Sequence, residues 1–218
     1  MSPMRNLLLT VCLTALLGSL ASAQAGKIES LGPPAGSSIS DAVKKTLDSK
    51  GYRVILDDGS VACDVWLREH LPAPAKQEVE GAIYPFAESS LLGVISFPQA
   101  TTDYRGQAIK PGVYTLRYEL IPSDGNHLGV SPNRDFLLLV PAGADPDPNA
   151  VFKFRELIEL SRQVTGTRHP GPLSLVQASS STPSVAKDDE GHWVFYAGLK
   201  LGGEDVPIGL VVKGTAPQ

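Results

Sequence analysis

The chain has 218 residues, of which 42% are hydrophobic and 19% are charged, and its formal net charge is −4. A chain this apolar can bury a core, which excludes a disordered charged tail. The acidic balance argues against a nucleic-acid-binding protein, which normally carries a basic face. We therefore expect a globular chain with no nucleic-acid partner.

Residues 1–23 have the pattern of a secretory signal peptide. Arg5 supplies a positive start, an apolar run covers 7–20, and Ala-Ser-Ala at 21–23 offers the small residues that signal peptidase accepts. The run is shorter than the ~20 residues that a membrane span needs, so cleavage is favoured over a retained anchor. We expect a bacterial protein exported to the periplasm or the medium, with no membrane span after cleavage and with 24–218 as a single domain.

The predicted elements start with one short helix within 36–51, where Ile39, Val43 and Leu47 lie four residues apart. A second helix is predicted at 151–164. Eight segments read as strands from their alternating or apolar pattern: 52–56, 61–67, 91–97, 113–121, 135–140, 173–177, 192–201 and 206–212. Asp-Gly within 57–60 and Gly-Gly within 202–205 supply the turn chemistry of tight hairpins.

This element order favours one fold class. Strands dominate, and regular β-α alternation is missing, which argues against a doubly wound parallel sheet. We expect a mainly β protein, an antiparallel β-sandwich of about seven to nine strands with two peripheral helices.

Side-chain alternation predicts which residues are buried. Cys63 shares a strand face with valines and a leucine, which predicts a buried apolar role rather than a reactive thiol. Core packing is the expected role of both Trp66 and Trp193, with stacking on a sugar as the alternative, and Trp66 is the more open to exposure because it lies on the polar face. In 113–121, Arg117 and Glu119 belong to the polar set and should face water as a weak surface ion pair or line a ligand surface.

The chain lacks the catalytic motifs that can be recognised locally. It has no G-x-S-x-G, no H-E-x-x-H, no C-x-x-C, no P-loop and no dinucleotide fingerprint. These absences favour a protein that is not an enzyme, without excluding one, and we predict no cofactor.

The loop at 123–134 is the first candidate binding site, since loops at hairpin ends often carry binding residues. The alternative is ordinary turn chemistry with a solvated histidine at the tip. Tyr104 and Arg105 would join the site if their turn lies at the same end of the fold. The predicted ligand-binding residues are Tyr104, Arg105, Asp124, Asn126, His127 and Arg134.

A second candidate has the spacing of a calcium loop. Its ligands would be Asp145, Asp147, Asn149 and Glu156, although Ala150 stands where glycine is expected. The simpler alternative is that Asp147 caps the second helix, with proline at the first helical position.

Histidines offer a metal site only if the fold brings them together. His70, His127, His169 and His192 are far apart in sequence, and zinc needs three such ligands, or two with a carboxylate. Isolated histidines are the commoner outcome, so the metal ligands stay open.

Two stretches resemble a family of exported bacterial β-rich proteins with no assigned activity. They are DYRGQAIKPGVYTLRYELIPSDGNHLGVSPNRDFLLLVPA at 103–142 and GYRVILDDGSVACDVWLRE at 51–69. The resemblance implies an exported β-rich protein and supplies no site residues.

Two functions from different classes follow. The first is a non-catalytic binding or accessory role, with a small ligand, a glycan or an envelope protein as partner. The alternative is a metal-binding protein or metal-dependent enzyme that uses the 124–135 loop.

Overall fold

The computed structural model describes residues 25–73, 80–122 and 131–215. Its helices are α1 (Asp41–Lys44) and α2 (Phe154–Thr165), with a 3-10 turn at Ala142–Ala144. Its strands are β1 (Lys27–Leu31), β2 (Gly51–Ile55), β3 (Val61–Leu67), β4 (Leu91–Phe97), β5 (Thr101–Thr102), β6 (Ala108–Ile109), β7 (Gly112–Leu120), β8 (Asp135–Pro141), β9 (Pro172–Val176), β10 (Ser184–Lys187), β11 (Trp193–Leu201) and β12 (Glu204–Lys213).

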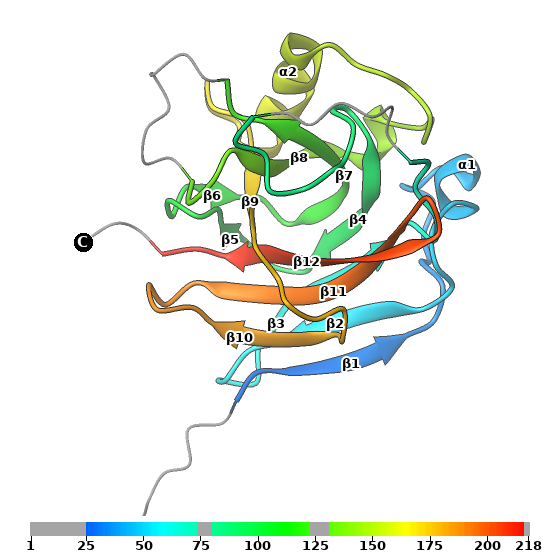
Figure 1. The fold of residues 1–218 in the computed structure, drawn as a ribbon. Coiled ribbons are helices and arrows are strands. Elements are labelled where there is room, and N and C mark those ends of the chain that lie inside the picture. The colour runs from blue at the N-terminus through cyan, green and yellow to red at the C-terminus, as the bar shows by residue number, and fades with distance from the viewer. Residues whose placement is uncertain (1–24, 74–79, 123–130, 216–218) are drawn as a thin grey trace, which may run out of the picture.

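Ten of these strands form one antiparallel sheet in the order β1-β2-β3-β4-β7-β8-β9-β12-β11-β10, and β5 pairs only with β6. The sheet curls until its two edge strands, β1 and β10, lie side by side (Figure 1). A twisted sheet of this width tends to curl in this way. An ion pair of 2.6 Å between Lys187 and Asp57 bridges the seam.

The mainly antiparallel β prediction is confirmed, although its division into two facing sheets is not. All eight predicted strands are present within two residues of their expected ends. Gly59 has φ 81°, and Gly202 and Gly203 have φ 58° and 94°, as the two predicted hairpin turns require. The sequence prediction missed β1, β5, β6 and β10, of which β5, β6 and β10 have only two to four residues and so establish no period.

The concave side of the sheet is filled with apolar side chains, including Cys63 and Trp193, as predicted. Trp66 is also buried, as expected, with 8% exposed, although it lies on the polar face of β3. It packs under α1 against Ile39, Val43 and Leu47, and its Nε1 donates to the carbonyl of Gly32 at 2.8 Å. The helix predicted within 36–51 supplies this cover with a single helical turn.

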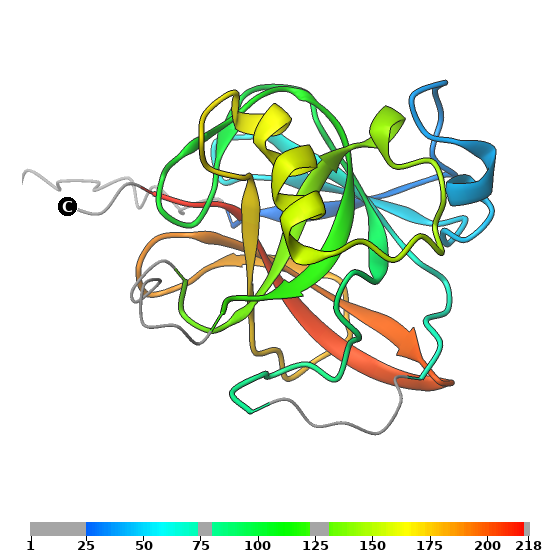
Figure 2. The same cartoon turned by 90° about the horizontal axis from the view of Figure 1, so that it is seen from above.

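The convex side of the sheet is also covered where β7 and β8 run. Leu157 of α2 packs against Phe136, Leu138 and Val140 of β8, and Figure 2 shows α2 lying over that strand. No helix within the described ranges is long and apolar enough to cross a membrane. β7 is therefore covered on both faces of the sheet, and this burial determines the environment of the candidate site.

Candidate functional site

The polar face of β7 is buried rather than open to water, so the predicted exposure of Arg117 and Glu119 is wrong. Arg117 is 0% exposed and Glu119 is 2% exposed. The segment between β8 and α2 folds back over this face, which the period of the strand alone does not reveal. Two charged side chains are therefore enclosed two residues apart on one strand.

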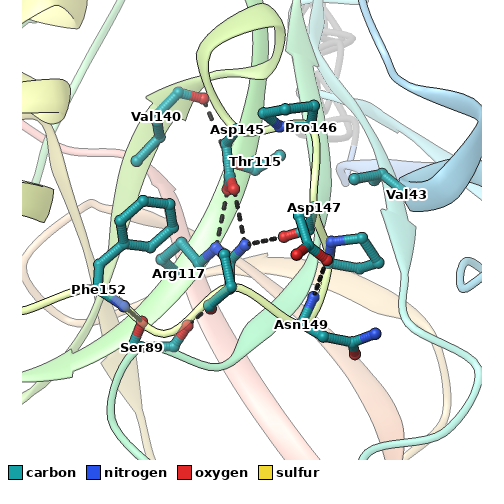
Figure 3. A network of polar contacts seen from close by, with 12 residues as sticks. Val43, Ser89, Thr115, Arg117, Val140, Asp145, Pro146, Asp147, Asn149 and Phe152 are labelled. Carbon is teal, nitrogen blue, oxygen red and sulfur yellow. Dashed lines mark hydrogen bonds and ion pairs between the residues drawn. The ribbon is translucent and has the colours of Figure 1, made fainter.

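Arg117 is fully partnered within the protein (Figure 3). Its Nε and Nη2 donate to the two carboxylate oxygens of Asp145 at 2.8 and 2.7 Å. Nη2 also donates to the carbonyl of Asp147, and Nη1 donates to the carbonyls of Ser89 and Ala150. These bonds use all five N–H groups of a guanidinium, so Arg117 has no donor left for a ligand.

The residues predicted as a calcium loop serve this structural role instead. The carboxylate of Asp145 is held by Arg117 and by the Thr115 hydroxyl at 2.6 Å. Asp147 accepts from the backbone N–H of Asn149, and Glu156 accepts from that of Lys153. The carboxylates face different protein partners, so the calcium interpretation is wrong. The helix-cap alternative is also wrong, because α2 begins at Phe154 with Lys153 at its N-cap.

Glu119 has a different environment at the end of β7. Burial, and secondarily the charge of Glu88, raise the pKa of Glu119 from 4.5 to about 7, while backbone N–H groups of Ser89 and Leu120 act in the opposite direction. A carboxyl that titrates near neutrality is a common feature of functional sites. Glu88 and Glu119 together are called the carboxyl pair below.

Ser89 lies beside the carboxyl pair in a strained backbone conformation. It is the only non-glycine residue of the described part of the chain with positive φ, at 68°. Its N–H donates to the carbonyl of Tyr118 at 2.7 Å, and its hydroxyl accepts from the N–H of Phe152 at 2.8 Å. Such conformations cost energy and concentrate at functional sites.

Asp135 and Arg134 fix the backbone around the same end of β7. The buried Asp135 carboxylate accepts from the N–H groups of Ile83 and Tyr84 and from the hydroxyl of Tyr118 at 2.6 Å. Arg134 donates to the carbonyls of Ile121 and Glu80. Both residues tie the segment before β4 to the base of the predicted loop.

The structure does not bring all the predicted ligand-binding residues together. Asp124, Asn126 and His127 lie outside the described residues. Arg134 precedes β8, whereas the turn of Tyr104 and Arg105 lies near Leu139, about 17 Å further along that strand. The turn of Tyr104 and Arg105 therefore does not lie at the same end of the fold as Arg134. The ligand-binding role of Tyr104 and Arg105 stays a prediction.

Tyr104 instead contacts the turn between β10 and β11. Its hydroxyl donates to Glu190 at 2.6 Å, and its ring lies 4.3 Å from that of His192. Burial and the Glu190 carboxylate raise the pKa of Tyr104 to about 12. His192 is buried, with Nδ1 3.0 Å from Asp188.

His70 and His169 are both exposed. In the portion of the chain that the structure describes, no three His, Cys, Asp or Glu side chains converge as a metal site.

The sequence reading singled out Glu119 as a possible ligand-facing residue but missed Glu88 and Ser89. No local pattern marks either one, because both become significant only through the approach of the segment before β4 to β7. Comparison with protein-family models, with curated proteins and with solved structures found no match for the chain.

Proposed function

We propose that the chain is an exported protein with a non-catalytic binding role, and that its ligand binds at the carboxyl pair near the end of β7. The observation that carries this proposal is the buried Glu119 carboxyl with a pKa of about 7. A folded protein keeps such a group at a cost to its stability, which is typical of sites maintained for function. The strained backbone of Ser89 at the same place supports the choice.

The chemistry of the carboxyl pair indicates which ligands suit it. Near neutral pH, Glu119 exchanges between an acid that donates a hydrogen bond and a carboxylate that accepts one. Its ionised form adds a second negative charge close to Glu88, and a cationic or hydroxyl-bearing ligand relieves that repulsion. Small amines, glycans and basic segments of envelope proteins meet this description.

A metal-binding protein is the second candidate, favoured by the same two carboxylates. They lie at the end of the strand that leads into the loop carrying Asp124 and His127. Oxygen and imidazole ligands together suit several divalent metals. In this reading Glu119 loses its proton when the metal binds.

Elemental analysis and calorimetry test both candidates on the full chain purified without chelator. Ligand or metal binding that releases a proton at pH 6 and is weakened at least ten-fold by Glu119→Gln supports the site. Glu204→Gln, which changes an exposed carboxyl on β12, is the matched control. Binding that both variants leave unchanged contradicts the site, and stoichiometric metal lost with His127→Ala selects the second candidate.

A further inference from the structure

Two stretches of the chain contain no acidic residue at all, although the whole chain has 23. They are residues 104–118 and 160–187. In a protein with a net charge of −4, this separation of charge creates the possibility of a local positive surface.

The fold places the two acid-free stretches against each other. The side chain of Gln107 donates to the carbonyl of Pro170 at 2.8 Å, and the N–H of Lys110 donates to that of Val164 at 3.4 Å. A Cβ added at Gly166 would lie 2.6 Å from Lys110 Nζ, so the ammonium rests on the C-terminal end of α2.

The two segments that meet at this junction carry five basic residues, here called the basic surface: Arg105, Lys110, Arg162, Arg168 and His169. All are exposed except Arg162, which is half-buried. Carboxylates border this surface on the side of Arg105, where the charge of Arg105 acts on Asp103, and Asp188 and Glu190 lie near Tyr104. Asp103 is buried and accepts from the backbone of its own turn, and Glu190 accepts from Tyr104.

A structural role explains only two of these five residues. Lys110 and Arg162 lie at the carbonyl end of α2, where cations stabilise the helix dipole, and Arg162 is further paired with Glu159. Across the described ranges, the side chains of Arg105, Arg168 and His169 enter no hydrogen bond or ion pair that would hold them for stability.

We propose that the basic surface binds phosphate groups. The guanidinium fork of arginine matches the oxygens of a phosphate, and histidine and lysine add compact donors. This site is separate from the carboxyl pair and does not depend on the proposed function. The phosphate belongs either to a small soluble ligand or to the headgroups of an anionic membrane.

The test titrates the purified full chain with inorganic phosphate and pyrophosphate, followed by amide NMR, and with vesicles of phosphatidylglycerol, followed by sedimentation. Vesicles of phosphatidylcholine are the neutral comparison. The variant Arg105→Gln/Arg168→Gln removes two charges from the basic surface, and Lys45→Gln/Lys50→Gln removes two exposed charges elsewhere. Thermal unfolding checks that both variants fold.

We expect the arginine variant to bind about thirty-fold more weakly and the lysine variant to bind as the parent does. Shifts confined to residues 104–110 and 160–170 with soluble phosphates alone identify a small ligand. Sedimentation with phosphatidylglycerol but not with phosphatidylcholine identifies a headgroup. Absence of binding to every probe, or an equal loss in both variants, overturns the proposal.

Discussion

Arg117 and Glu119 lie on the same buried face of β7, yet the fold treats their charges in opposite ways. The segment that covers Arg117 supplies a carboxylate and two carbonyl groups, and Ser89 supplies a third carbonyl, so each of the five N–H groups of Arg117 is bonded. Glu119 has a neighbouring carboxylate, Glu88, and its pKa rises to about 7. Burial alone therefore does not identify a functional charged residue. A buried charge with an opposite charge and hydrogen bonds around it is structural, whereas one beside a like charge is a candidate site.

Removing the Asp145 carboxylate that pairs with Arg117 should have the largest effect on stability. Asp145→Ala leaves a buried guanidinium without its counter-ion, and we expect a loss of about 3–5 kcal/mol in the free energy of unfolding. Urea denaturation measures this loss. The double variant Arg117→Met/Asp145→Leu removes both charges and should lose less than Asp145→Ala alone. A single variant that is no less stable than the double one would contradict the structural role.

Neutralising Glu119 should raise the free energy of unfolding, whereas Asp145→Ala lowers it. Its pKa is higher in the folded chain than the ordinary 4.5, so the folded state holds the proton longer. Stability then falls as pH rises from about 4.5 to about 7. We expect Glu119→Gln to be more stable than the parent by about 3 kcal/mol above pH 7, at ~1.4 kcal/mol per pH unit, with no difference below pH 4.5.

Urea denaturation across pH 4 to 8 measures the Glu119 effect. Glu88→Gln is the companion variant, because removing the second carboxylate should lower the pKa of Glu119 and flatten the pH dependence of stability. Parallel pH profiles for the parent and Glu119→Gln would show that Glu119 titrates normally, and the contrast with Arg117 would disappear.

The sequence predicted β7 closely but not the surroundings of its polar face. Alternation along 113–121 identified the buried Tyr114, Leu116 and Tyr118 correctly, because the period of a strand is a local property. The cover over Arg117 comes from Asp145 and its neighbours, 28 residues further along the chain. Pairing over that separation is decided by tertiary packing, which one sequence does not encode in any local pattern.

The same limit explains the outcome for the candidate site. Ser89 and Glu88 have no distinguishing sequence context, and their role depends on the hydrogen bonds that join Ser89 and Ser90 to Tyr118. Turn chemistry, by contrast, was predictable at Gly59 and at Gly202, because glycine at a positive φ is a local requirement.

Ser89 contacts both environments, because its carbonyl accepts a hydrogen bond from Arg117 and its backbone lies beside Glu119. Ser89→Ala loses the hydrogen bond to the Phe152 N–H and keeps the strained φ, so we expect a loss of about 2 kcal/mol. Ser89→Gly loses the same bond but relieves the strain, and should be about 1 kcal/mol more stable than Ser89→Ala. Equal stability of the two variants in urea would show that the φ of 68° carries no strain.

The ion pair between Arg53 and Asp64 tests whether burial is the deciding variable. These residues lie opposite each other on β2 and β3, with two bonds of 2.8 and 2.9 Å, close to the geometry at Arg117 and Asp145. The Arg53 side chain is 39% exposed, however, so water compensates either charge when its partner is removed. We expect Asp64→Asn to lose at most about 1 kcal/mol, with the loss reduced by salt. A loss as large as that of Asp145→Ala would mean that bond geometry, rather than enclosure, makes the Arg117 network strong.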